Sequence, residues 1–230
     1  MAEPRPLPVR LPAAKPSASE DFLPDSRSLP ALREAAASCV GCELFRRATQ
    51  VVFGEGPADA RLVLVGEQPG DQEDRGGRPF VGPAGALLAR TLEAVGIDRT
   101  QVYVTNAVKH FKWEPRGARR VHQKPSAAEV QACRGWLMAE LDAVRPAMIV
   151  CLGATAAQAF LGRTFSVTRS RGEVYATPWA RWWMATYHPS ALLRMPDAAS
   201  RAAATAAFEA DLAVAAAALA GLRAAARRAS

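Results

Sequence analysis

The chain has 230 residues, enough for one globular domain with a sizeable apolar core, which excludes a mini-protein that depends on covalent crosslinks. Lys and Arg number 29 against 22 Asp and Glu, giving a formal net charge of +7. Such an excess favours a polyanionic partner such as nucleic acid, but an Arg-rich chain with a basic, disordered end has the same excess without any function. The motifs must therefore separate these alternatives.

The two ends of the chain lack the patterns of targeting segments. Residues 1–30 are rich in Pro, Ala and Ser without hydrophobic periodicity, so we expect a disordered leader before a domain that covers residues 31–225. The leader has no apolar stretch followed by a cleavage site, and we expect a cytoplasmic protein. The run from Leu212 to Leu222 is about half the roughly 20 residues that cross a bilayer, so no membrane span is expected. We expect a short tail at 226–230 and a monomer.

The part of the chain between these ends alternates between apolar runs and helical periodicity. In chain order the sequence predicts a strand at 61–66, a helix at 83–95, a strand at 102–105, a helix at 126–144, a strand at 148–152, a helix at 154–161, a strand at 182–187 and a helix from about 198. Ser126 and Glu129 have the spacing of a capping box at the start of one of these helices. Strands separated by helices predict an α/β fold with a parallel sheet covered on both faces.

Polar residues follow three of the predicted strands directly. Glu67 follows the first strand, Asn106 the second and His188 the last. Because ligands of parallel sheets bind beyond the carboxyl ends of the strands, these residues predict a pocket at that edge. The alternatives are local: Asn106 could simply end its strand, and His188 could serve a turn or a cap.

The segment GEQPGDQED, at residues 66–74, is acidic where a phosphate-binding loop would need backbone amides and Lys. The chain has no GxxxxGK[ST] pattern, so nucleotide triphosphate binding is disfavoured. Carboxylates such as Glu67 and Asp71 can position water, orient a base or stabilise a cationic transition state, although a solvated acidic turn is the plain alternative. Phe80, shortly after this segment, could be a core aromatic or a face on which a base stacks.

His122 lies in the basic stretch GARRVHQKP, which we interpret as an exposed, irregular loop. An imidazole there could be mobile and inert, but next to Arg119 and Arg120 it is also close to any bound phosphate backbone.

In a reducing compartment the four cysteines are poor candidates for disulfides and better candidates for metal ligands or buried thiols. Cys39 and Cys42 form a CxxC pair, Cys133 lies on a predicted helix and Cys151 lies inside an apolar strand. One CxxC pair indicates zinc, an iron-sulfur cluster or redox chemistry without distinguishing them. If Cys151 is a core residue, a four-ligand site needs another donor, for which His110 is the candidate.

These residues together resemble the family 4 uracil-DNA glycosylases, and more closely their X-type relatives, known as UdgX. The resemblance covers roughly residues 35–215 and depends on the ordered motifs CVGC, GEQPGDQED, PFVGPAG, VTNAVKH, RRVHQKPS, CLGATAA and YHPSALLR. Ordinary family 4 enzymes tend to have Ala in place of Gln68, Cys in place of His110, and no Arg-rich insertion. At all three places this chain has the feature typical of the X-type relatives. It departs from them at Ala118, where X-type loops usually have Lys.

The resemblance implies a three-layer α/β/α sandwich with a mainly parallel sheet, a 4Fe-4S cluster, and excision of uracil that is flipped out of DNA. The implied cluster ligands are Cys39, Cys42, His110 and Cys133. Uracil would stack on Phe80, Asn106 would recognise its edge, and its O2 atom would lie near His188. The remaining residues that we expect at the substrate or the DNA are Gln68, Asp71, Arg119, Arg120 and Lys124.

The resemblance also implies an unusual covalent step, in which His122 bonds to C1′ of the sugar after uracil leaves. A neutral imidazole is a stronger nucleophile than water toward a sugar with oxocarbenium character. Glu67 would orient or deprotonate His122, and His188 would favour departure of the anionic base. We expect single-stranded DNA to be preferred, because flipping a base out of a duplex costs pairing and stacking.

Two alternatives remain from the sequence. A conventional family 4 enzyme would hydrolyse the glycosidic bond with turnover, and a non-catalytic module would bind nucleic acid and leave uracil in place. The feature that separates the first alternative from covalent capture is His122 in its basic loop.

Overall fold

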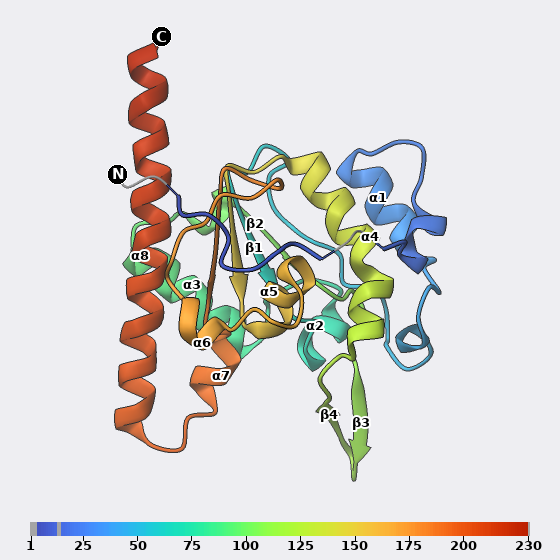
Figure 1. The fold of residues 1–230 in the computed structure, drawn as a ribbon. Helices are drawn as coiled ribbons and strands as arrows, with labels where there is room; N and C mark the ends of the chain where they lie inside the picture. Colours follow the sequence, from blue (N-terminus) through green and yellow to red (C-terminus); the bar gives the residue numbers. More distant parts are fainter. Residues whose placement is uncertain (1–3, 13–14, 230) are drawn as a thin grey trace.

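The centre of the fold is a four-stranded parallel sheet in the computed structural model, which describes residues 4–12 and 15–229 (Figure 1). The strands are β1 (Leu62–Gly66), β2 (Val102–Asn106), β5 (Met148–Leu152) and β6 (Trp182–Thr186). Their order across the sheet is β2-β1-β5-β6, with Gly66 beside Asn106 in the register of β1 and β2. Every residue of these strands is buried, which explains why they form continuous apolar runs rather than alternating ones.

Helices cover both faces of the sheet, as Figure 1 shows. On one face, side chains such as Leu64 and Val150 pack with Leu92 and Phe208 of helices α3 (Pro83–Ala94) and α8 (Ala198–Ala229). On the other face, alternate strand residues such as Ile149 pack with α1 (Leu29–Ala36), α4 (Ala127–Val144) and α5 (Ala154–Leu161). The predicted three-layer α/β/α sandwich is confirmed.

The helices and strands that the sequence predicts all form, with ends that differ by a few residues at most. The Ser126–Glu129 capping box is present, with the Glu129 backbone amide donating to Ser126 Oγ at 3.2 Å. The structure adds helix α1 (Leu29–Ala36), which the sequence analysis did not predict. It also adds short helices that carried no clear periodicity, namely η1 (Ala18–Phe22), η2 (Glu43–Arg46), α2 (Asp71–Gly76), η3 (Arg99–Gln101), α6 (Val167–Ser170) and α7 (Pro189–Leu193).

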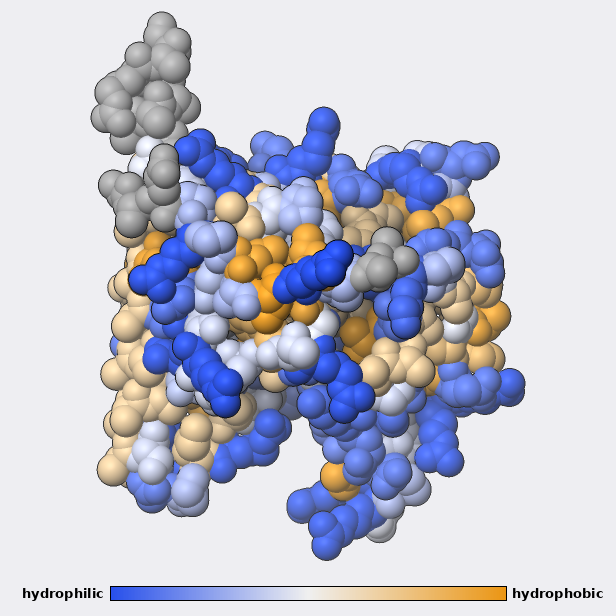
Figure 2. Space-filling model, viewed as in Figure 1, coloured by the Kyte–Doolittle hydropathy of each residue, from blue (hydrophilic) through white to orange (hydrophobic). Residues whose placement is uncertain are grey.

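The basic stretch around His122 is a β-hairpin, not the irregular loop that the sequence predicted. Strands β3 (Trp113–Arg116) and β4 (Arg119–His122) pair antiparallel, with Trp113 opposite His122. Gly117, in the turn, has a φ of +58°, a conformation that glycine adopts readily. Hydrophilic side chains cover the hairpin where it projects from the body of the protein (Figures 1 and 2). It thus lacks the apolar alternation from which a strand is predicted.

The described residues of the leader lie against the domain, which differs from the expected disorder. The backbone of Arg5 pairs with Tyr175, and its amide donates to the Val174 carbonyl at 2.9 Å. Ser17 Oγ donates to the Ala132 carbonyl at 2.7 Å and accepts from the Gly135 amide. Leu7, Val9 and Leu11 also pack against the hydrophobic core. The leader therefore has a short apolar alternation, which the sequence analysis did not use.

Helix α8 contains the one stretch of the described residues, Ala198–Gly221, that is long and apolar enough to cross a membrane by length and composition. Its Phe208, Leu212 and Ala215 side chains are fully buried against the sheet. This stretch therefore forms a layer of the fold, and length and composition are weak evidence for a span.

Candidate active site

A cavity of about 560 Å³ lies at the carboxyl edge of the sheet, where the sequence predicted a pocket. Its wall combines residues from strand ends, from the hairpin and from the starts of helices α2, α3, α5 and α7. Among the side chains that line it are Glu67, Phe80, Asn106, His122, Thr155 and His188. Figure 2 shows the surface hollowed between the hairpin and the region of α7, on the side where this cavity opens.

Phe80 and Asn106 close over Gly66 at the floor of this cavity. A Cβ atom on Gly66 would lie 2.3 Å from Asn106 Oδ1 and 2.7 Å from Phe80 Cζ. Glycine is therefore the only residue type at this position that lets these two side chains approach as they do. Phe80 itself has a φ of +58°, which is strained for an aromatic residue and indicates that its ring is held in place by its surroundings.

His188 faces Phe80 from the start of α7, with the ring centroids 6.4 Å apart and nearly parallel. The Ser190 amide donates to His188 Nδ1 at 3.2 Å. The Ser190 hydroxyl lies 2.8 Å from the same Nδ1, and a hydroxyl can donate as well as accept. With Nδ1 accepting from the amide, the proton of the neutral ring is assigned to Nε2. Burial lowers the pKa of His188 to about 4, although the nearby Glu67 charge opposes that shift. His188 is thus a neutral hydrogen-bond donor at pH 7.

Glu67 links the hairpin to the start of α5. His122 Nε2 lies 3.3 Å from Glu67 Oε1, and Thr155 Oγ1 donates to Glu67 Oε2. Burial alone would raise the pKa of Glu67, but the hydrogen bonds from His122 and Thr155 outweigh it and the pKa is lowered. The carboxylate therefore stays ionised at pH 7 and can accept a proton from the imidazole.

Gln68 holds the base of the hairpin rather than projecting freely into the cavity. Its Nε2 donates to the carbonyls of Lys112 and Gln123 at 3.2 and 3.0 Å, and its Oε1 accepts from the Lys112 amide. These two partners flank the hairpin on either side, so one amide fixes where both strands leave the domain. Gln68 shapes the cavity by positioning His122.

Arg120, which we expect at the DNA, forms ion pairs within the protein. Its guanidinium binds the carboxylates of Asp71 and Asp74, and its side chain is only 14% exposed. The guanidinium also lies over the rings of Phe111 and Trp113. Arg120 therefore fastens the hairpin to helix α2. Arg119 and Lys124, by contrast, are exposed as a phosphate contact requires.

Comparison with known proteins identifies the family. The model of the uracil DNA glycosylase superfamily matches residues 53–213. The chain belongs to the uracil-DNA glycosylase superfamily. It is 42% identical over 162 residues to the type-4 uracil-DNA glycosylase of Thermotoga maritima, covering 70% of this chain and 81% of the relative. It is 40% identical to the type-4 enzyme of Archaeoglobus fulgidus, over 70% of this chain and 80% of the relative. It is also 35% identical to a type-5 uracil-DNA glycosylase of Pyrobaculum aerophilum, over 60% of this chain and 64% of the relative.

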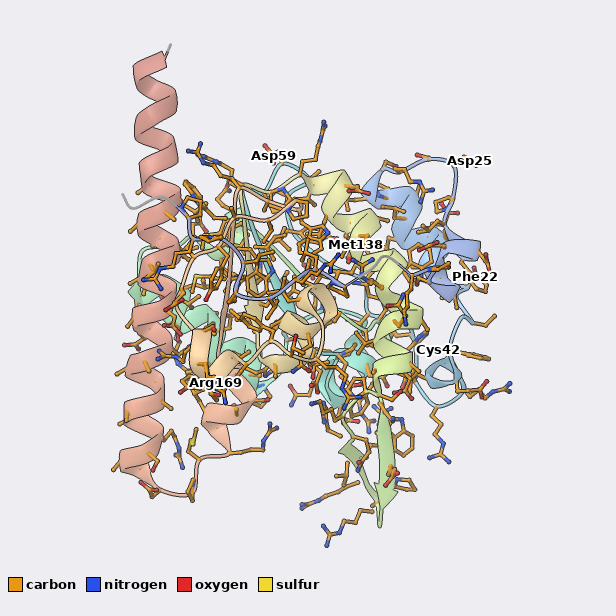
Figure 3. All side chains as sticks on the ribbon, viewed as in Figure 1. Phe22, Asp25, Cys42, Asp59, Met138 and Arg169 are labelled. Carbon is orange, nitrogen blue, oxygen red and sulfur yellow. The ribbon has the colours of Figure 1, made fainter. Side chains whose placement is uncertain are left out.

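Cys39, Cys42 and Cys133 lie at or beside helix α4. The pKa of Cys133 is raised to about 12, mainly by burial, with smaller contributions from the charges of Cys42 and Cys39. Figure 3 shows Cys42 beside helix α4, which carries Cys133. Cys39 Sγ accepts from the Trp136 indole, and Cys133 Sγ accepts from the Lys109 amide, each at 3.2 Å. Such N–H donors are typical around sulfurs that carry negative charge.

The fourth predicted ligand, His110, is buried directly after Lys109. Burial lowers the pKa of His110 to about 4 against the opposing charge of Asp74, so its ring is neutral, as a ligand must be. Within the described part of the chain, no three His, Cys, Asp or Glu side chains converge as for a single metal ion. A cluster differs in this respect, because each ligand binds a separate iron. Cysteine sulfurs and a neutral imidazole are donor types that iron-sulfur clusters use.

A buried ion pair joins the cysteine region to the carboxyl edge of the sheet, and the sequence analysis missed it. Lys109 Nζ pairs with Glu140 and donates to the backbone carbonyl of Asn106 at 2.8 Å. Glu140 also accepts from the Tyr103 hydroxyl and the Thr105 hydroxyl. The pair thus fixes the backbone from which the Asn106 side chain enters the cavity. Sequence reasoning also missed Thr155, whose signal was its place just beyond the end of β5.

Proposed function

We propose that this protein excises uracil from DNA. Membership of the superfamily supports this function, since the relatives in Thermotoga maritima and Archaeoglobus fulgidus are named uracil-DNA glycosylases. The observation that carries the proposal is the convergence of Phe80, Asn106 and His188 on one cavity. Together they provide an aromatic face, a planar amide and a neutral imidazole donor, which are the groups that recognise a flipped pyrimidine.

In this mechanism uracil stacks on Phe80 while the amide of Asn106 forms hydrogen bonds with the polar edge of the ring. As the bond between uracil N1 and sugar C1′ breaks, its electron pair moves onto the base. His188 Nε2–H donates to the O2 atom, where that negative charge develops. Because the His188 ring is neutral, it stabilises the anionic base by donating a hydrogen bond and does not transfer a proton to it. The substrate on this account is uracil in single-stranded DNA, which needs no unpairing.

The second step of the proposal is capture of the sugar by His122. An imidazole nitrogen donates its lone pair to C1′, the other ring nitrogen gives its proton to Glu67, and this proton neutralises the departing uracil. The distance of 3.3 Å between His122 Nε2 and Glu67 Oε1 supports this role, as does the fixed hairpin. The product bond has no built-in hydrolytic step, so each molecule acts once. Conventional hydrolysis with turnover is the alternative.

We also propose that Cys39, Cys42, His110 and Cys133 hold a 4Fe-4S cluster. The fit of neighbouring sulfurs with N–H donors and a neutral imidazole supports this assignment. When bound, the cluster supplies a structural crosslink between the segment before η2 and helix α4. The chemistry at the sugar is carried by the protein's own side chains.

The test of excision uses purified protein and single-stranded oligonucleotides that carry either uracil or thymine at one position. We expect free uracil to be released from the first and no base from the second. An Asn106→Leu variant should no longer release uracil. The control is Gln101→Leu, which also replaces an amide by an aliphatic group but at an exposed residue remote from the cavity. Binding of uracil-containing DNA without release of any base would contradict the proposal.

A further inference from the structure

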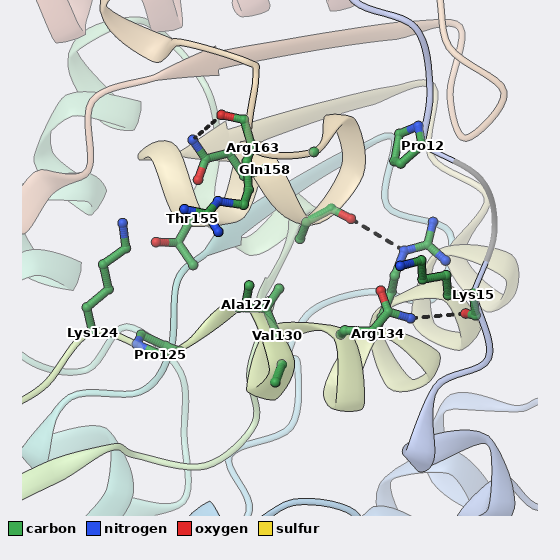
Figure 4. A pocket seen from close by; sticks show the side chains of 14 residues that line it. Pro12, Lys15, Lys124, Pro125, Ala127, Val130, Arg134, Thr155, Gln158 and Arg163 are labelled. Carbon is green, nitrogen blue, oxygen red and sulfur yellow. Dashed lines mark hydrogen bonds between the residues drawn. The ribbon is translucent and has the colours of Figure 1, made fainter.

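A second hollow, of about 860 Å³, lies between the first half of α4 and helix α5 (Figure 4). Lys124 and Thr155 line both this hollow and the active-site cavity, so the two are adjacent. Figure 4 shows Lys124 and Thr155 at one end and Lys15 and Arg134 toward the other. We call this hollow the basic groove, defined by Lys15, Lys124, Arg134, Thr155, Gln158 and Arg163.

The charge of the basic groove is entirely positive among the described residues that line it. Its four charged side chains are Lys15, Lys124, Arg134 and Arg163, and none of its described lining residues is acidic. In the described parts of the chain, none of these four forms an ion pair. This differs from Arg120, whose charge is matched by two carboxylates. The groove therefore attracts anions without first breaking a salt bridge.

The rest of the lining indicates which anion fits. The neutral walls consist mainly of small aliphatic residues, such as Ala127, Val130 and Pro125, and include no aromatic ring among the described lining residues. Bases of single strands usually stack on aromatic side chains, so this surface suits the sugar-phosphate backbone instead. Arg134 Nε donates to the Ala159 carbonyl at 3.4 Å, which holds the guanidinium across the groove and leaves its remaining N–H groups available for phosphate oxygens.

We propose that the basic groove binds the backbone of the uracil-carrying strand on one side of the flipped nucleotide. The strand leaves the active-site cavity past Lys124 and Thr155 and continues between α4 and α5. This inference rests on the proposed function, and it adds a sequence-independent binding site for several further nucleotides. Binding there depends on salt, because each phosphate that the groove neutralises releases counterions.

The test compares an Arg134→Gln/Arg163→Gln variant with wild type and with a charge-matched Arg61→Gln/Arg145→Asn control. The control residues precede β1 and β5, so they lie at the opposite edge of the sheet from the cavity. Binding of a long, uracil-free single strand is measured by fluorescence anisotropy over a range of salt concentrations. Uracil release is measured in parallel from a uracil-containing trinucleotide, which fills the active-site cavity alone. Arg163→Gln serves as a second variant with an exposed substitution site if the double variant does not fold.

We expect the groove variant to bind the long strand on the order of tenfold more weakly, with a salt slope shallower by about 0.7 for each phosphate that it no longer neutralises. Its release of uracil from the trinucleotide should equal that of wild type. Two further strands carry extra nucleotides on either the 5′ or the 3′ side of uracil only. The groove variant should bind one of these two strands more weakly than wild type does, and the other with unchanged affinity. Unchanged affinity and slope, or equal losses of affinity for the groove and control variants, would overturn the assignment. Absence of uracil release by wild type from both the trinucleotide and a long uracil-containing strand would instead refute the proposed function itself.

Discussion

His122 Nε2 lies 3.3 Å from Glu67 Oε1, although one residue ends a hairpin strand and the other follows a strand of the central sheet. Two contacts outside this pair keep it together. Gln68 ties both ends of the hairpin to the segment after β1, and Arg120 ties β4 to helix α2. The imidazole contacts Glu67 on one side and is 43% exposed, so its other side is open to the cavity.

The pH dependence of uracil release should reflect the low pKa of His188. Since that pKa is about 4, the ring stays neutral well below the pH at which an ordinary histidine gains its proton. In a His122→Ala variant, we expect the rate of uracil release to be nearly constant between about pH 7.5 and pH 5.5 and to fall as pH approaches about 4. A tenfold decrease in rate centred near pH 6.5 would contradict this.

A Gly66→Ala substitution should abolish most uracil release without unfolding the protein. The added methyl group must displace Asn106 Oδ1 and the Phe80 ring from their positions. A shift of about 1 Å in groups that position a substrate reduces rates by about 100-fold. Release kinetics and circular dichroism measure the two effects. Gly76→Ala is the control, because a Cβ atom there meets nothing within 4 Å. Near-wild-type release by Gly66→Ala would show that the close approach is unnecessary.

Replacing Gln68 should separate release of uracil from capture of the sugar. Gln68→Ala removes three hydrogen bonds to the residues that flank the hairpin, while Phe80, Asn106 and His188 keep their own contacts. We expect the covalent product to fall at least about tenfold relative to released uracil. The ratio of the two products in one reaction is the measurement, and Gln101→Ala, at an exposed site, is the control. A parallel decrease of both products would indicate that Gln68 supports the whole cavity instead.

The buried Lys109–Glu140 pair predicts a characteristic pattern of stability. Lys109→Met leaves the Glu140 carboxylate buried without its cation, and we expect the free energy of unfolding to fall by about 3–5 kcal/mol. Adding Glu140→Gln removes the unpaired charge, so the double variant should recover a substantial part of that stability. Denaturant unfolding of wild type, both single variants and the double variant gives the interaction free energy between Lys109 and Glu140. Simple addition of the two single effects would show that the charges are not coupled.

The central sheet and the residues at its edge could be predicted because the strands are buried on both faces. Continuous apolar runs located the strands, and the polar residues just after them located Glu67, Asn106 and His188. The hairpin could not be predicted in this way, since its strands are short and mostly exposed. The inward direction of Arg120 depends on Asp71 and Asp74, which lie far away in the chain. Long-range polar contacts of this kind leave no periodic pattern in a sequence.

The most direct test of the account is the intact mass of the protein after incubation with a single-stranded oligonucleotide that contains one uracil. Wild type should give a heat-stable species whose mass equals protein plus oligonucleotide minus one molecule of uracil, and this species should be absent from His122→Ala. Free DNA with alkali-sensitive abasic sites, produced by wild type over many turnovers, would contradict covalent capture by His122.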